Sequence, residues 1–122
     1  MTQITGNVDK KVFHQLRTPD VRKRFGGLII SRVDKVDFEF AKFAFSISSK
    51  VAKAVRRNKL RRQLKAILSQ PEIVFPTAAY LIIARKQAFE ESFLELQHDL
   101  ATAASYFMNR DKHNNDKQSL IY

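Results

Sequence analysis

A stripe of apolar residues at helical spacing is the clearest hydrophobic pattern in this chain. Its members fall at i, i+4, i+7 and i+8 and are Leu60, Leu64, Ile67 and Leu68. On a helix these positions form one apolar face about 100° wide, which is the pattern of a helix packed against a core. The pattern predicts a helix from Lys50 to Leu68, capped at its start by Ser48 or Ser49 and ended before Pro71.

Two other segments show the same helical period. Residues 8–16 carry apolar side chains on one side and predict a short N-terminal helix that ends before Pro19. Residues 91–107 have apolar positions three and four apart, which predicts an amphipathic helix of about four turns. Residues 109–122 are polar without a period, so we expect a mobile C-terminal tail there and one folded domain over residues 1–108.

Residues 28–33 and 79–84 predict two strands. The first follows Gly26-Gly27, and residues 22–24 before these glycines form a small basic cluster. The second is a short, wholly apolar run, which is typical of a strand buried on both faces. We therefore place residues 79–84 at the centre of the sheet.

An alternation of aromatic residues changes phase between these two strands. Phe38 and Phe40 alternate in one phase, and Phe43, Phe45 and Ile47 alternate in the other. Either two strands meet at a tight turn near residues 41–42, or one long strand contains a bulge. The order of helix, two or three strands, helix, strand and helix predicts an α+β domain with helices packed against one sheet.

Charge gives the central helix a candidate function. The chain has 22 Lys and Arg against 12 Asp and Glu, a net charge of +10. Eight cations with no acidic residue among them lie in the helix segment, and they are Lys50, Lys53, Arg56, Arg57, Lys59, Arg61, Arg62 and Lys65. A merely solvated face usually mixes signs at i,i+4, so we expect this face to bind a polyanion, with nucleic acid as the default partner. Asn58 joins the set because its amide can donate and accept at a sugar or base edge.

The residue inventory argues against several enzyme classes. Zero cysteines exclude disulfides, thiolate zinc sites and cysteine nucleophiles. His14, His98 and His113 are scattered, and no metal-binding His pair, paired carboxylates near the basic helix or Gly-rich phosphate loop occurs, so we hypothesise that no protein side chain is catalytic. The chain start lacks a signal-peptide pattern and the longest apolar run is too short to cross a bilayer, so we expect a cytoplasmic protein.

Residues 46–65 closely resemble the signature of the protein subunit of bacterial ribonuclease P. That family carries a Lys-Lys-x-Gly-x-Ala-Val-x-Arg-Asn-Arg-x-Lys-Arg pattern on a central basic helix. The matching positions here are Ala54, Val55, Arg57, Asn58, Arg61 and Arg62. Residues 80–85 also resemble the family's apolar strand that ends in Ala-Arg. The sequence departs from the pattern at Ser49, Ala52, Lys59 and Ala66. Because lysine lacks the planar fork of arginine, we expect a point-charge phosphate contact at Lys59.

The resemblance implies a fold and a function. The fold is a single-domain α/β sandwich in which one mixed four-stranded sheet packs with three helices, with a left-handed βαβ crossover. The function is that of the RNA-binding subunit of a ribonucleoprotein endonuclease, which assists a catalytic RNA in the hydrolytic removal of the 5′ leader from precursor tRNA. The partners are the ribonuclease P RNA and precursor tRNA. The Mg²⁺ of the reaction is expected on the RNA, with no metal site formed by the protein alone.

The resemblance further implies a cleft between the sheet and the N-terminal helix that holds the single-stranded leader. Such a cleft needs cations for phosphates and flat side chains on which bases stack. Phe13 fits the first of two family aromatics four residues apart, and Arg17 occupies the second position. Phe13 and Arg17, together with Phe43 or Phe45, are the candidates for the cleft, and most other Phe side chains are expected in the core.

Other functions remain open from the residues alone. The main alternative is a general structured-RNA-binding module of the ribosomal or RNA-chaperone type with no role in cleavage. A DNA-binding helix is disfavoured because no neighbouring helix joined by a short turn is predicted. A membrane-surface helix is disfavoured because the core requires the apolar stripe, and a protein nuclease would cut RNA without an RNA partner.

Overall fold

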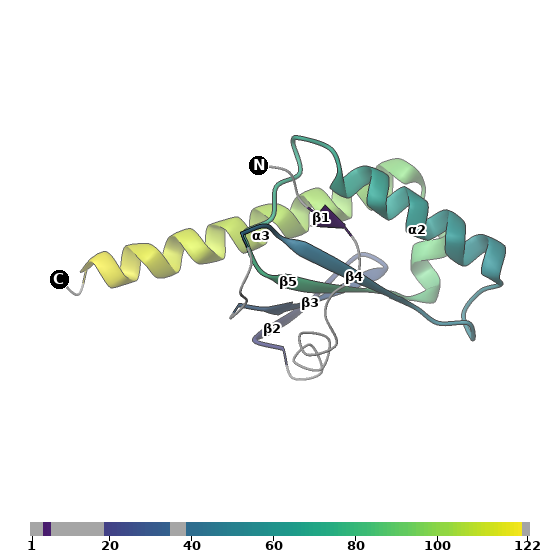
Figure 1. Cartoon of the computed structure of the whole chain (residues 1–122), viewed down its shortest axis with the longest axis horizontal. Coiled ribbons are helices and arrows are strands. Elements are labelled where there is room, and N and C mark those ends of the chain that lie inside the picture. The colour runs from purple at the N-terminus through teal and green to yellow at the C-terminus, as the bar shows by residue number, and fades with distance from the viewer. Residues whose placement is uncertain (1–3, 6–18, 35–38, 121–122) are drawn as a thin grey trace.

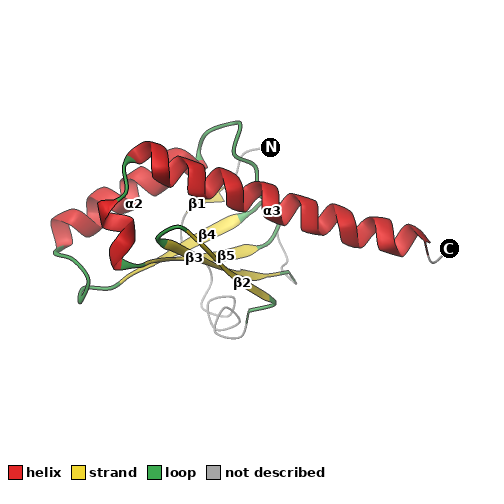
Figure 2. Cartoon of the chain, turned by 180° about the vertical axis from the view of Figure 1, so that it is seen from behind, coloured by secondary structure: helices red, strands yellow, loops and turns green. Residues whose placement is uncertain are grey.

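The computed structural model describes the backbone of residues 4–5, 19–34 and 39–120 and the side chains of residues 19–34 and 39–112. The elements in chain order are β1 (Ile4–Thr5), β2 (Val21–Phe25), β3 (Leu28–Val33), β4 (Lys42–Ile47), α2 (Ala54–Leu68), β5 (Ala79–Ala84), the 3₁₀ helix η1 (Lys86–Glu90) and α3 (Phe93–Leu120). The strands form one sheet, and α2 and α3 lie on one face of it (Figures 1 and 2). The predicted α+β class is confirmed.

The sheet is mixed, as predicted, and its strand order is β1-β4-β5-β3-β2. β5 pairs in parallel with β4 and antiparallel with β3, which gives the apolar run of residues 79–84 its predicted central place. The four longer strands are the expected sheet, and the two-residue strand β1 extends it in parallel beside β4. The link from β4 through α2 to β5 joins two parallel strands, and its left-handed course stays a prediction.

The basic cluster at residues 22–24 is part of a strand that we did not predict. β2 pairs antiparallel with β3 from Val21 to Phe25, and Gly26-Gly27 forms the turn between them. Gly26 has φ of 58°, a conformation that glycine adopts without steric cost. The sequence did not predict this strand because Phe25 is its only buried residue, so the strand shows almost no apolar alternation.

The change of phase among the aromatic residues is explained by the start of strand β4 at Lys42. β4 begins there, whereas Glu39 and Phe40 lie in a bend before it. The Thr77 hydroxyl donates to the Glu39 carbonyl at 3.1 Å, which ties this bend to the segment that leads into β5. The described residues therefore contain one strand in this region, and Phe38 lies outside them.

The apolar stripe on α2 is confirmed, but the predicted start of the helix is wrong. Its buried residues are Leu60, Leu64, Ile67 and Leu68. α2 begins at Ala54 rather than Lys50, and neither predicted serine caps it, since the N-cap residue is Lys53 and has no side-chain cap bond. The Ser48 hydroxyl instead accepts a hydrogen bond from the Lys50 N–H at 3.1 Å, which stabilises a turn before the helix.

Helix α3 begins as expected and runs further than expected. Ser92 and Glu95 form a capping box, in which the Ser92 hydroxyl accepts from the Glu95 N–H at 3.1 Å and Glu95 Oε1 accepts from the Ser92 N–H at 3.3 Å. Of the apolar positions that predicted this helix, Phe93 at its start is exposed, whereas the rest are buried, namely Leu96, Leu100, Ala103, Ala104 and Phe107. The helix then continues to Leu120, through most of the segment expected as a tail, and the mobility of that segment stays a prediction.

An ion pair explains part of this continuation. Arg32 on β3 is only 4% exposed, and its Nη2 donates to Asp111 Oδ2 on α3 at 2.8 Å. The hydrogen bond to Asp111, with the charges of Asp34 and Asp111, raises the pKa of Arg32 although burial alone would lower it. The sequence from residue 93 to 120 also contains no Gly or Pro to end the helix.

The core lies between the sheet and the two helices. Phe43, Phe75, Tyr80 and Phe107 form its aromatic centre, with ring centroids 5.0 to 6.2 Å apart. Burial raises the pKa of Tyr80, whose hydroxyl donates to the Pro76 carbonyl at 2.6 Å. Among the described residues no helix combines the length and apolarity that crossing a bilayer requires. The predicted helix over residues 8–16 lies outside the described residues.

Candidate nucleic-acid interface

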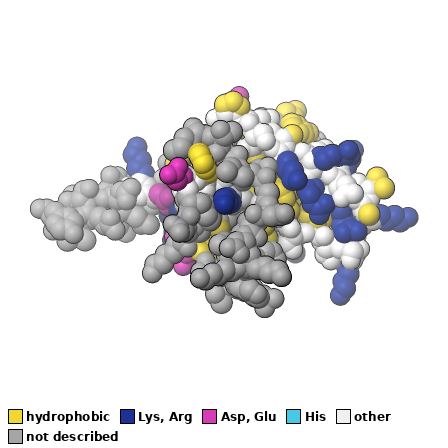
Figure 3. Space-filling view, in the orientation of Figure 1, with side chains coloured by type: hydrophobic (Ala, Val, Ile, Leu, Met, Phe, Trp, Pro, Cys, Tyr) yellow, Lys and Arg dark blue, Asp and Glu magenta, His cyan; other side chains and the backbone are white. Residues whose placement is uncertain are grey.

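The predicted basic residues come together on α2 and the turn before it. We call this set the basic helix surface, and it consists of Lys50, Lys53, Arg56, Arg57, Asn58, Lys59, Arg61, Arg62 and Lys65. Arg57 and Arg61 are half-buried and the other seven residues are exposed. Figure 3 shows Lys and Arg side chains gathered on the side of the molecule that α2 forms. The apolar stripe holds the helix on the core, which leaves the rest of its circumference for a ligand.

The carboxylates that the structure describes form no salt bridge with this surface. Arg32 makes the two salt bridges found among the described side chains, and neither involves α2. α2 also has no acidic residue in its first turn. Glu91 lines the same groove as Arg56 and Lys59, and the rest of the surface is open to solvent ions or a bound polyanion.

Asn58 and Arg61 are linked in the middle of the surface. Arg61 Nη1 donates to the Asn58 side-chain oxygen at 2.9 Å, an i,i+3 contact that orients both groups. With Val55, Arg62 and Lys65 they line a shallow depression of about 480 Å³. Val55 is 79% exposed, so the depression offers an apolar patch among cationic side chains.

A second contact joins α2 to the 3₁₀ helix η1. The guanidinium of Arg56 lies 5.5 Å from the Phe89 ring centroid, and its Nη2 donates to the Phe89 carbonyl at 3.4 Å. Lys59, Gln63 and Phe89 line a small groove of about 170 Å³ beside this contact. Next to it, Arg57 Nε is buried and has no hydrogen-bond partner among the described residues. On this surface the guanidinium of Arg56 is therefore held by contacts with η1, whereas that of Arg57 has a donor that makes no hydrogen bond with the described residues.

The two described aromatic candidates for the leader cleft, Phe43 and Phe45, lie on the core face of β4. Phe43 is fully buried, stacks on Tyr80 with ring centroids 5.1 Å apart, and meets Phe75 edge-on. A ring enclosed in this way cannot stack on a base, so the choice of Phe43 was wrong. Phe45 is on the same face of β4 and packs, half-buried, against the same core. Phe13 and Arg17 lie outside the described residues.

The opposite face of the sheet was missed by sequence reasoning. The strand register places Ile29, Ala44, Leu81 and Ile83 together on the face away from α2 and α3, and all four are half-exposed. The signal was present, because residues at odd and even positions of β5 must point to opposite faces. We call this set the open sheet face.

An acidic cluster lies at the turn between β2 and β3. Glu91 Oε1 accepts from the Gly27 N–H at 2.6 Å, and Glu91, Glu95, His98 and Asp99 line a hollow of about 370 Å³. Burial, and then the hydrogen bond with Glu91, raises the pKa of Asp99 to about 7. Within the described part of the chain, no group of three or more His, Cys, Asp or Glu side chains could hold a metal ion.

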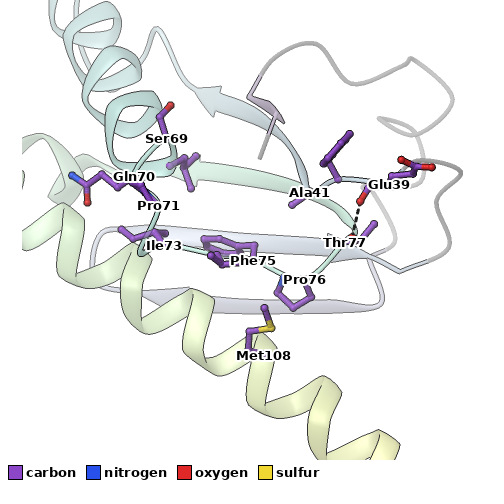
Figure 4. A pocket seen from close by; sticks show the side chains of 13 residues that line it. Glu39, Ala41, Ser69, Gln70, Pro71, Ile73, Phe75, Pro76, Thr77 and Met108 are labelled. Carbon is purple, nitrogen blue, oxygen red and sulfur yellow. Dashed lines mark hydrogen bonds between the residues drawn. The ribbon is translucent and has the colours of Figure 1, made fainter. Parts of the chain in front are cut away.

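A hollow of about 510 Å³ lies between α3 and the loop from α2 to β5 (Figure 4). Met108 of α3 and Ile73, Phe75 and Pro76 of the loop contribute apolar lining. No Lys or Arg is among its described lining residues, which distinguishes it from the basic helix surface.

Comparisons with known proteins agree with this arrangement. The sequence model of the family described as Ribonuclease P matches residues 8–107. The ribonuclease P protein component of Thermus brockianus is 44% identical over 57 residues, which cover 47% of this chain and 34% of that protein. The corresponding protein of Geobacillus sp. (strain WCH70) is 29% identical over 73 residues, which cover 59% of this chain and 63% of that protein. The chain thus spans from about a third to under two thirds of these relatives.

Solved structures share the fold. The ribonuclease P protein of Staphylococcus aureus superposes with a TM-score of 0.67 at 18% identity, covering 87% of this chain and 94% of that one. The ribonuclease P protein of Thermotoga maritima gives a TM-score of 0.67 at 20% identity, covering 75% and 87%. With the family match over residues 8–107 and the basic helix at the expected place in the fold, the chain belongs to the ribonuclease P protein family.

Proposed function

We propose that the protein is the RNA-binding subunit of ribonuclease P and assists a catalytic RNA in removing the 5′ leader from precursor tRNA. The observation that carries this proposal is the basic helix surface, whose charge no described carboxylate neutralises, on a chain of this family. The surface is proposed to bind the RNA subunit. Each phosphate neutralised there releases counterions, so binding is expected to weaken steeply with salt.

The residues of the surface suit different roles. Arg57 presents a planar fork that can bind a phosphate through two hydrogen bonds, whereas Lys59 supplies a point charge. The contact between Asn58 and Arg61 holds one amide and one guanidinium ready for a sugar or base edge. Because these groups are oriented before binding, less side-chain entropy is lost when RNA binds.

The leader is proposed to lie along the open sheet face. Its half-exposed residues offer apolar contact to unstacked bases, and Arg22 and Arg24 of β2 lie on the same face. Phe13 and Arg17 remain predicted contributors from the N-terminal segment.

Cleavage is proposed to be the chemistry of the RNA, with Mg²⁺ bound to RNA phosphates. The protein lowers the magnesium demand because its cations neutralise phosphates that would otherwise need metal ions. It also fixes the leader in register with the active site, which lowers the entropy cost of reaching the transition state.

The direct test is cleavage of a precursor tRNA by a bacterial ribonuclease P RNA at low magnesium, with and without this protein. We expect cleavage at the mature 5′ end to require both. If cleavage is not stimulated although the protein binds RNA tightly, the chain is a general RNA-binding module. If the protein alone cleaves, the assignment of catalysis to the RNA is wrong.

Arg57→Ala tests the basic helix surface in the same assay. A hydrogen bond to a charged group contributes about 1.5–3 kcal/mol, so we expect roughly 10- to 100-fold weaker binding to the RNA subunit. The matched control is Arg110→Ala, which removes an arginine from α3 outside the surface and is expected to bind normally. Equal affinity of both variants would remove Arg57 from the interface.

A further inference from the structure

The 3₁₀ helix η1 contacts both the β2–β3 hairpin and α2, and it is fixed to the turn of the hairpin. The Arg85 N–H, just before η1, donates to the Gly27 carbonyl at 2.9 Å. Glu91, just after η1, accepts from the Gly27 N–H at 2.6 Å, and Ala88 in its middle is fully buried. Because both ends of η1 bind one residue of the turn and its middle lies in the core, η1 is a rigid support for other side chains.

η1 holds one arginine of the basic helix surface. The guanidinium of Arg56 lies 5.5 Å from the Phe89 ring centroid, and its Nη2 donates to the Phe89 carbonyl at 3.4 Å. Phe89 is half-buried and packs against the core, so its ring is a fixed platform for the cation. Both contacts are with neutral groups, so they orient Arg56 and leave its charge in place.

η1 holds an arginine of β2 in the same way. Arg24 Nη2 donates to Gln87 Oε1 at 2.9 Å, and its Nε donates to the Gly26 carbonyl at 3.0 Å. These partners are again neutral. Successive residues of a 3₁₀ helix are rotated by about 120°, so Gln87 and Phe89 point in different directions. η1 can therefore hold a cation of the hairpin and a cation of α2 at the same time.

The partners of these two arginines differ from those of the buried arginine in the fold. Arg32 is 4% exposed and pairs with Asp34 and Asp111, which balance its charge inside the protein. Arg24 and Arg56 are exposed and form no salt bridge with the described side chains. A guanidinium that is oriented but not neutralised still attracts an anion, and it loses less side-chain entropy when the anion binds. This arrangement favours a role in ligand binding over a role in folding.

We propose that Phe89 and Gln87 are positioning residues for RNA binding, which orient Arg56 toward the RNA subunit and Arg24 toward the leader. Neither residue needs to touch RNA, because each acts through the arginine that it holds. η1 thereby sets the arrangement of two arginines that come from separate elements. The inference rests on the proposed function for the identity of the two RNA segments.

The test at Phe89 is a double-mutant cycle with Arg56, measured as affinity for ribonuclease P RNA. Phe89→Leu keeps an apolar side chain and the backbone carbonyl but loses the ring, and we expect about 2- to 5-fold weaker binding. Phe89→Tyr keeps the face of the ring and is expected to restore the affinity. In the Arg56→Gln background, Phe89→Leu is expected to have no further effect, because no guanidinium is left to position.

Salt dependence separates positioning from charge. Arg56→Gln removes a cation and is expected to reduce the slope of log affinity against log salt by about 0.7–0.9, the contribution of one phosphate contact. Phe89→Leu leaves every cation in place, so we expect weaker binding at each salt concentration with an unchanged slope. The control Phe93→Leu removes an exposed ring from the start of α3 and is expected to bind like the parent. Thermal unfolding of each variant checks that the fold is retained.

The test at Gln87 uses precursor tRNA with and without its leader, bound by the complex of this protein with ribonuclease P RNA. Gln87→Ala is expected to weaken binding of the leader-bearing tRNA about 2- to 5-fold, a modest loss because the bond from Arg24 Nε to Gly26 remains. Binding of the leaderless tRNA is expected to be unchanged. In the Arg24→Gln background, Gln87→Ala is expected to have no further effect.

Three results would overturn the proposal. One is unchanged affinity for both Phe89→Leu and Gln87→Ala, and another is a loss of the same size with and without the arginine, which would make both residues structural. The third is an equal loss for Phe93→Leu. A protein that shows the coupling but does not stimulate cleavage would contradict the proposed function and support the positioning roles. A protein that stimulates cleavage without the coupling would do the reverse.

Discussion

Helix α2 and strand β2 both carry clustered cations, yet only α2 could be recognised from its sequence. α2 carries four buried apolar residues at helical spacing, and this stripe fixes both its structure and the side that faces the core. β2 has five residues and buries only Phe25 fully, so its apolar pattern is too short to define a period.

The difference shows what positions a charged surface in a small domain. On α2 the helix provides its own anchor, and the cations occupy the remaining circumference. On β2 the anchor lies in other elements, because β3 supplies the hydrogen bonds and Tyr106 and Phe107 of α3 supply the packing for Phe25. A basic segment can therefore be structured even when its own sequence shows no structural period.

The largest expected effect tests the anchor of α2. Leu64 is fully buried, so Leu64→Ala is expected to lower the free energy of unfolding by about 2–5 kcal/mol. Chemical denaturation measures this change. Val55→Ala shortens an apolar side chain on the exposed side of the same helix and is expected to change stability by less than about 0.5 kcal/mol. Similar destabilisation by both variants would mean that α2 does not pack through its stripe.

An intermediate effect is expected at the turn that anchors β2. A Cβ on Gly27 would collide with the backbone nitrogen of Ala88, which cannot move without shifting η1. We expect Gly27→Ala to cost about 1–3 kcal/mol, the usual range for overpacking.

Gly26→Ala is the matched comparison for the turn. Gly26 has φ of 58°, and a Cβ there would meet only the end of the Asp99 side chain, which can rotate away. Its cost is therefore expected to be the left-handed strain of about 1–2 kcal/mol, and smaller than that of Gly27→Ala. Thermal unfolding of the two variants ranks them, and the reverse order would show that the hairpin turn is free to shift against η1.

Much of the fold could be predicted because its long elements have strong periods. The stripe of α2, the central strand β5 and the buried face of α3 each follow from a few apolar positions in sequence. The start of α2 could not be predicted in this way. Residues 50–53 suit a helix, but hydrogen bonds from the Lys50 and Val51 N–H groups to Ser48 form a turn instead.

Only part of the candidate site, too, could be predicted from the sequence. The cations of α2 could be predicted as a surface, since a helix with one buried stripe must expose the rest. For Phe43 and Phe45, alternation shows that they share a face, but only the register with β5 and the position of the helices show that this face is the core. The continuation of α3 past Phe107 likewise involves a contact that the sequence does not show, because Asp111 bonds to Arg32, which lies 79 residues earlier in the chain.

The smallest expected effect concerns pH at the β2 turn. The folded protein raises the pKa of Asp99 from 3.8 to about 7, so it holds this proton more tightly than the unfolded chain does. Stability from this group is therefore complete below about pH 4 and is lost as the pH rises through about 7. Asp99→Asn cannot ionise and can still donate to Glu91, so its unfolding temperature is expected to fall less than that of the parent across this range.

The difference between the two pH curves isolates Asp99, because the other titrating groups are common to both proteins. The effect is expected to be modest because Asp99 is only partly buried and solvent screens its charge. Glu72→Gln, at an exposed position in the loop after α2, is the control and should follow the parent curve. Parallel curves for Asp99→Asn and the parent would show that folding leaves the pKa of Asp99 unchanged. Glu91 and the glycines would then hold the turn of β2 at every pH. The anchors of α2 and β2 would differ in the residues that form them but not in their response to pH.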